Sequence, residues 1–185
     1  IPFNGKSRGE IMCDAMELIR ELCGDKLILG CGVPLAPAFG KVDFCRIGAD
    51  MALSWNKKPF SREDVSTKHA LLNTVFRREL DGRAFLNDPD VFLLRDNNIN
   101  MSFEQRKTIA ETASLFGNLL FVSDDVSTYN DEQKECFIDV TTQNKAKIDY
   151  VNMDKDGDLS IKYTLDNEKK GYCFNINNGN KKTLI

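Results

Sequence analysis

The sequence predicts an α/β fold in which alternating strands and helices, residues 1–143, precede a small antiparallel sheet, residues 145–185. Two observations predict this arrangement. The first part holds four short apolar stretches without polar alternation, separated by stretches of helical periodicity, which is typical of parallel strands covered on both faces. The last part changes to a two-residue alternation of apolar and polar residues, which is typical of antiparallel strands.

Length and composition are those of one globular domain, or of one domain with a small appendage. The 185 residues are 42% hydrophobic and 29% charged, which is normal for a soluble protein. A net charge of -3 gives no electrostatic reason to expect nucleic acid or an anionic membrane as a partner. No apolar stretch is long enough to span a bilayer.

Cysteine spacing argues against a metal site. The six cysteines are scattered, none forms a Cys-x-x-Cys pair, and most lie in apolar segments. This pattern favours buried, reduced thiols in a cytoplasmic protein over zinc ligands. Because the chain opens at Ile1 without a methionine, we expect it to be a piece of a longer protein.

The first elements are a helix and two strands. Helical spacing over 7–23 places five apolar residues on one face, and Gly24 ends the helix; they are Ile11, Ala15, Leu18, Ile19 and Leu22. Short buried strands are predicted over 26–33 and 42–47.

The next elements repeat the pattern. A helix over 66–80 leads through the turn Asp81-Gly82 to a strand over 83–86. Ser102 and Gln105 have the spacing of a capping box, which predicts a helix over 102–116. A fourth strand over 118–123 and a last helix over 130–142 follow.

The final segment is predicted to be antiparallel, with Asp156-Gly157 and Lys170-Gly171 as turns between strands. The stretch 152–159 also resembles the first half of a calcium-binding loop. However, position 12 of that loop would be Tyr163 where calcium requires a bidentate glutamate, and the flanking segments read as strands. A hairpin turn is the better interpretation, and no metal site is predicted.

Polar residues follow each predicted parallel strand, as in a (β/α)8 barrel, where sites lie at the C-terminal ends of the strands. They are Cys31-Gly32, Arg46 to Asp50, Asp88 to Asp90 and Ser123 to Asp125. Four strands are visible where a closed barrel needs eight, so the sequence predicts four βα units, half of a TIM barrel.

Each candidate residue also has a purely structural interpretation. Cys31 can be a buried thiol, and Asp88 or Asn87 can cap the next segment. Arg46 and Asp50 can form a surface ion pair, although an arginine directly after an apolar strand is more typical of a cleft. His69, the only histidine, lies within a predicted helix, where a packing or surface role is favoured over catalysis.

The order of these motifs resembles a known family. LILGCGVPLAPAFGKVDFCRIGADMAL followed by GRAFLNDPDVFLLRDNN is similar to α-galactosidase-like enzymes of glycoside hydrolase family 36 and their clan relatives of family 27. The resemblance covers nearly the whole chain. It implies the second half of a catalytic (β/α)8 barrel, followed by the start of a C-terminal β domain.

The resemblance implies a retaining glycosidase without cofactors that acts on terminal α-linked galactosides. Asp50 matches the family's acid/base, and Arg46 matches the arginine that binds a sugar hydroxyl. Cys31 and Gly32 match the substrate-contacting segment after the fifth strand, and Asp90 matches the second aspartate of the Asn-Asp-Pro-Asp motif.

The chain departs from the family at two points. The family's nucleophilic aspartate would fall before Ile1, so the isolated chain is expected to be inactive. Gly32 stands where family 27 members often carry a glutamate, which leaves α-N-acetylgalactosaminides open as an alternative substrate class. A second hypothesis is a non-catalytic half-barrel that binds carbohydrate or self-assembles through its open sheet edges.

Overall fold

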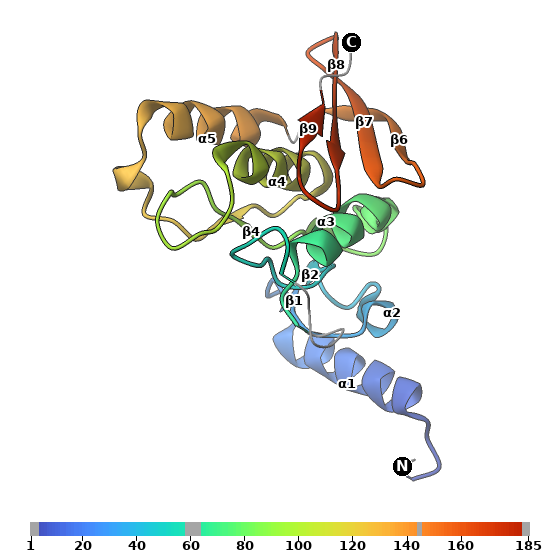
Figure 1. Ribbon diagram of the computed structural model, residues 1–185. Coiled ribbons are helices and arrows are strands. Elements are labelled where there is room, and N and C mark those ends of the chain that lie inside the picture. Colours follow the sequence, from blue (N-terminus) through green and yellow to red (C-terminus); the bar gives the residue numbers. More distant parts are fainter. Residues whose placement is uncertain (1–3, 58–63, 144–145, 183–185) are drawn as a thin grey trace.

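The computed structural model describes residues 4–57, 64–143 and 146–182. The α/β prediction is confirmed, and Figure 1 shows helix α1 at one end of the molecule and the antiparallel sheet at the other. The first elements are α1 (Arg8–Cys23), β1 (Leu29–Gly30), α2 (Leu35–Ala38), β2 (Phe44–Arg46), α3 (Thr67–Phe76), η1 (Arg78–Leu80), β3 (Leu86–Asp88) and β4 (Val91–Phe92). None of the helices in these described ranges is both long and apolar enough to cross a membrane.

The remaining elements complete the helical part and form the antiparallel sheet. They are α4 (Phe103–Phe116), β5 (Phe121–Val122), η2 (Val126–Thr128), α5 (Asp131–Gln143), β6 (Lys147–Met153), β7 (Asp158–Leu165), β8 (Glu168–Asn175) and β9 (Lys181–Lys182). The capping box predicted for α4 is confirmed. Ser102 Oγ accepts from the Gln105 N–H at 3.3 Å, and Gln105 Oε1 accepts from the Ser102 N–H at 2.9 Å.

The parallel strands lie in the order β1-β2-β3, with β4 paired to β5. The third strand begins later than predicted over 83–86: Asn87 and Asp88 belong to the strand, and Gly82 to Ala84 form a turn. Asn87 O accepts from the Asn118 N–H at 3.0 Å, so the chain leading into β5 also runs beside β3.

One face of this sheet is open, contrary to the prediction that both faces are covered. Gly30, Cys45 and Asn87 point to the buried face. On the other face the register aligns Leu29, Phe44 and Leu86, which are exposed or half-buried. The predicted apolar face of α1 is open as well: Leu18, Ile19 and Leu22 are exposed, and Met16 is the buried residue of this helix.

The antiparallel sheet has the order β6-β7-β8-β9. The turn predicted at Lys170-Gly171 is wrong, because Asp166 and Asn167, with φ of 50° and 66°, connect β7 to β8. Gly171 lies inside β8, where a Cβ would stand 2.8 Å from Ile161 O. The turn at Asp156-Gly157 is confirmed and joins β6 to β7.

The antiparallel sheet shares one hydrophobic core with three helices of the first part of the chain. Side chains of β7 and β8 pack with those of α3, α4 and α5 in a single buried cluster; these include Leu71, Val75, Phe92, Ile109, Val140, Leu159, Ile161 and Phe174. A smaller cluster around Cys45, Ile47 and Phe85 lies beneath β1 to β3. The division into a barrel half, residues 1–143, and a β domain, residues 145–185, stays a prediction.

The shared core makes a prediction about cooperativity. Ile161→Ala should lower the free energy of unfolding by about 2–5 kcal/mol, because its fully buried side chain leaves a cavity between the sheet and the helices. If the shared core unfolds as one unit, the helical circular dichroism signal and the Trp55 fluorescence signal should be lost at the same urea concentration. The control Ile138→Ala, at a 62% exposed position, should change stability by less than about 0.5 kcal/mol.

Candidate functional site

Arg46 forms ion pairs with three carboxylates at the C-terminal ends of β2 and β3. Arg46 ends β2 and lies opposite Asp88, which ends β3. Its Nε is 3.0 Å from Asp88 Oδ2, and its Nη1 is 2.8 Å from Asp90 Oδ1 and 3.1 Å from Asp50 Oδ1. The predicted association of Arg46 with Asp50 and Asp90 is therefore present as a single cluster.

The three carboxylates differ in their access to solvent. The Asp88 and Asp90 side chains are 0% and 7% exposed, whereas the side chain of Asp50 is 69% exposed. Arg46 itself is 14% exposed. The buried carboxylates of Asp88 and Asp90 therefore bind the guanidinium on its protein side, and Asp50 is the carboxylate of this cluster that an incoming ligand can reach.

Electrostatics reinforce this arrangement. Burial tends to lower the pKa of Arg46, but Asp90 and Asp88 together outweigh it and raise that pKa above its ordinary value. Burial raises the pKa of Asp90, opposed by hydrogen bonds from backbone N–H groups and by the charge of Arg46. The arginine therefore stays a cation.

The backbone around Asp90 is shaped to hold this cluster. Asp90 has a positive φ of 86° directly after Pro89, and its N–H donates to Asp88 Oδ1 at 2.9 Å. This bend separates β3 from β4. It also lets Asp90 Oδ2 accept the Met51 N–H at 2.5 Å, which fixes the segment that carries Asp50.

Cys31 and Gly32 follow β1, one strand away from Arg46. Cys31 is exposed rather than buried, and Gly32 has a φ of 71°. Burial raises the pKa of Cys45 to about 11, with smaller contributions from Asp88 and from Cys31. Cys31 also makes a small contribution to the raised pKa of Arg46.

The sequence places Asp88 among the polar residues at the strand ends but assigns it no role in the site. It lies in the Asn-Asp-Pro-Asp motif, which was equally compatible with a turn, and its pairing with Arg46 depends on strand register. His69 belongs to the first turn of α3, where its N–H donates to Ser66 Oγ at 3.3 Å. Over the ranges that the structure describes, no three His, Cys, Asp or Glu side chains group as metal ligands.

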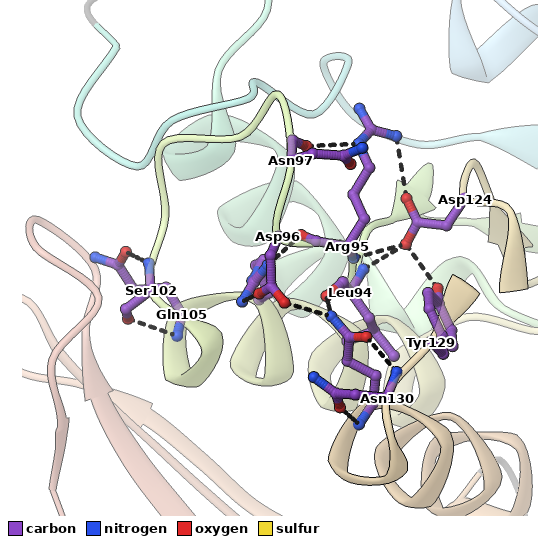
Figure 2. A network of polar contacts seen from close by, with 11 residues as sticks. Leu94, Arg95, Asp96, Asn97, Ser102, Gln105, Asp124, Tyr129 and Asn130 are labelled. Atoms are coloured by element: carbon purple, nitrogen blue, oxygen red, sulfur yellow. Dashed lines mark hydrogen bonds and ion pairs between the residues drawn. The ribbon is translucent and has the colours of Figure 1, made fainter.

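A second polar network surrounds Asp124 after β5 (Figure 2). The Asp124 side chain is 0% exposed, and Oδ2 accepts from the N–H groups of Leu94 at 2.6 Å and Arg95 at 3.0 Å. The Tyr129 hydroxyl donates to the same oxygen at 2.6 Å, and Arg95 Nη1 lies 3.0 Å from Oδ1. Both oxygens are therefore engaged by the protein, which makes Asp124 a structural anchor.

The same network continues into α4 and α5. Arg106, 3% exposed, pairs with Asp96 at 2.5 Å and donates to the Arg95 carbonyl. Gln133 Nε2 donates to the Leu94 carbonyl at 2.8 Å and to Asp96 Oδ2 at 3.1 Å. These contacts tie the chain after β4 to both helices.

Comparison with known proteins shows a shared fold. No family model matches the sequence. The α-galactosidase of Thermus thermophilus in complex with p-nitrophenyl α-D-galactopyranoside superimposes with a TM-score of 0.67 and 23% identity, over 85% of this chain and 32% of that chain. Its complex with stachyose gives a TM-score of 0.60 and 28% identity, over 69% of this chain and 29% of that chain.

A fungal enzyme gives a similar result. α-Galactosidase I from Mortierella vinacea matches with a TM-score of 0.67 and 14% identity, over 93% of this chain and 49% of that chain. The chain therefore has the α/β fold of a part of these glycoside hydrolases, and it spans less than half of their length.

The buried partners of Arg46 generate a stability prediction. Asp88→Asn should lower the free energy of unfolding by about 3–5 kcal/mol, because it leaves a mostly buried guanidinium short of one charge partner. Asp50→Asn is the matched control: it removes an exposed partner of the same arginine and should cost less than about 1 kcal/mol. Urea denaturation measures the free energy of unfolding of both variants. Equal losses of stability would contradict the distinction between the buried Asp88 and the exposed Asp50.

Proposed function

We propose that the chain is the C-terminal part of the catalytic barrel of a retaining α-galactosidase-type glycoside hydrolase, with Asp50 as its acid/base. The observation that carries the proposal is the Arg46 cluster. An arginine fixed by Asp88 and Asp90 presents an exposed carboxylate at the C-terminal edge of parallel strands, where barrel enzymes place their sites. The fold likeness to α-galactosidases supports the substrate class.

The retaining mechanism assigns a role to each residue. Asp50 protonates the departing glycosidic oxygen and then, as a carboxylate, removes a proton from the attacking water. Arg46 donates to a sugar hydroxyl while Asp88 and Asp90 hold its side chain in place. Cys31 and Gly32 line the sugar site from the end of the neighbouring strand β1.

The nucleophile has to come from outside this cluster. A retaining glycosidase needs two carboxyl groups about 5–5.5 Å apart, one on each side of the anomeric carbon. Asp88 and Asp90 are buried and occupied by Arg46, so neither is free to attack a sugar. We therefore assign the chain the acid/base half of the site and expect no turnover from it alone.

Sugar binding is tested through the exposed thiol. Galactose should slow the alkylation of Cys31 by iodoacetamide, because a sugar on Arg46 covers that strand end, and mass spectrometry of the digested chain measures the rate. Cys13, exposed on α1, is the internal control and should react at an unchanged rate. Glucose at the same concentration should not protect Cys31, and protection by N-acetylgalactosamine would define the alternative substrate class.

Two outcomes would contradict the proposal. Arg46→Lys loses the planar guanidinium and should abolish the protection by galactose, so undiminished protection would remove the arginine from the site. Release of p-nitrophenolate from p-nitrophenyl α-D-galactopyranoside by the chain alone, lost in Asp50→Asn, would show that the nucleophile lies within it.

The cytoplasmic location of the chain stays a prediction. It is supported by the six cysteines, which are all unpaired in the structure, because thiols stay reduced in the cytoplasm.

A second candidate function, self-assembly, is favoured by the open apolar surface. Leu22 and Leu27 are 77% and 76% exposed, Leu18 on α1 is also exposed, and Leu29 is exposed in β1, an edge strand of the described sheet. An unpaired parallel edge next to exposed leucines can accept strands of another segment. A second copy of the chain would meet this need if its β5 edge, which carries the exposed Phe121, paired with β1.

Sedimentation velocity distinguishes this candidate. If copies assemble through the β1 edge, the sedimentation coefficient should rise with concentration, and the double substitution Leu22→Glu and Leu27→Glu should return the chain to a monomer. Ile138→Glu, on the exposed face of α5, is the control and should leave the association unchanged if that face takes no part. A concentration-independent monomer would contradict self-assembly.

A further inference from the structure

The turn between β8 and β9, residues 176–180, packs onto the loop that carries Asp50. Trp55, 3% exposed, belongs to the long connection between β2 and α3. Its Nε1–H donates to the Ile176 carbonyl at 3.1 Å. Its ring meets Phe174 edge-on, with centroids 6.1 Å apart and planes at 86°. The antiparallel sheet thus contacts the loop between β2 and α3, which is far from it in the sequence.

Gly179 makes this contact sterically close. It has a φ of +73°, and a Cβ at this position would lie 2.6–2.8 Å from three ring atoms of Trp55. Real Cβ atoms do not approach heavy atoms so closely, and the buried indole is close-packed, so it cannot easily move away. The glycine therefore permits the turn to lie directly against the ring.

Two further contacts fix the same turn from other elements. Lys68 Nζ, on α3, lies 2.6 Å from Asn177 Oδ1, and Gln105 Nε2, on α4, donates to the Asn178 carbonyl at 2.8 Å. The turn is therefore held at three points, and its position relative to the helices is set independently of Trp55.

The chain between Trp55 and Asp50 is short and pinned. The Asn100 N–H donates to the Leu53 carbonyl at 2.7 Å, and the Met51 N–H donates to Asp90 Oδ2 at 2.5 Å. The Asp50 carbonyl accepts from the Ser66 N–H at 2.9 Å. A displacement of Trp55 is therefore passed along a short segment, first to the Asn100–Leu53 hydrogen bond and then to the Met51–Asp90 hydrogen bond next to Asp50.

We propose that the β8–β9 turn is a positioning element for Asp50, with Trp55 and Gly179 as positioning residues that act through the Met51–Asp90 hydrogen bond. The inference rests on the proposed function in naming Asp50 as the acid/base. It gives the C-terminal sheet a part in the site: the sheet holds the acid/base loop over Arg46, although none of its side chains belongs to the Arg46 cluster.

The test compares two glycines in the intact chain. Gly179→Ala and Gly40→Ala both place alanine at a positive φ, of 73° and 68°, but nothing lies within 4 Å of the Cβ at position 40. Gly179→Ala should speed amide hydrogen exchange at Met51 by about tenfold and shift its proton resonance upfield, because the bond to Asp90 opens more often. Since Trp55 is the only tryptophan, its emission should also move to longer wavelength.

Gly40→Ala should leave the Met51 exchange rate and the Trp55 emission unchanged, which separates the effect of the contact from that of backbone strain. If Gly179→Ala does not fold, Trp55→Phe replaces it: the ring stays apolar, the donor to Ile176 is lost, and Met51 exchange should again accelerate. Unchanged Met51 exchange in the folded variant would overturn the proposal. Hydrogen exchange requires no turnover, so this outcome is independent of whether the chain proves to be part of a glycosidase.

Discussion

The arrangement of the first sheet depends on the charge of Arg46. An arginine at the end of a short strand would be costly to bury, and Asp88 on the neighbouring strand compensates it at 3.0 Å. Because the two residues face each other in register, the ion pair links β2 to β3 where the hydrogen-bonded ladder ends. Asp90 completes the compensation and at the same time accepts the Met51 N–H, so a single charge organises two strands and the loop beyond them.

The same sheet leaves one face open in the part of the chain that the structure describes. Leu29, Phe44 and Leu86 form a row on the face that also carries Arg46 and Asp88, and the helices cover only the opposite face. In a closed barrel such a row packs against its counterparts from other strands, and the charged layer above it becomes the floor of the site. Leu29 of this row also belongs to the proposed assembly surface, so the two proposed surfaces meet at β1.

Sequence reasoning succeeded where the signal was local. The Ser102–Gln105 cap and the strand predicted over 42–47 follow from neighbouring residues; the cap is present, and the strand is present as the shorter Phe44–Arg46. It failed where distant residues decide the outcome. Asp88 extends β3 because it pairs with Arg46 of β2, and Gly171 belongs to β8 because it pairs with Lys162 of β7. The exposed leucines of α1 could not be anticipated, since helical spacing identifies an apolar face but not the partner that covers it.

The positive φ of Asp90 has a consequence for how this site can evolve. A non-glycine residue at a φ of 86° carries backbone strain of about 1–3 kcal/mol, which glycine would relieve. Glycine would also remove the carboxylate that holds both Arg46 and Met51. The loss of a charge partner from a mostly buried guanidinium costs about 3–5 kcal/mol, which exceeds the strain that glycine would relieve. A substitution at position 90 therefore cannot relieve the backbone strain without losing the larger charge compensation.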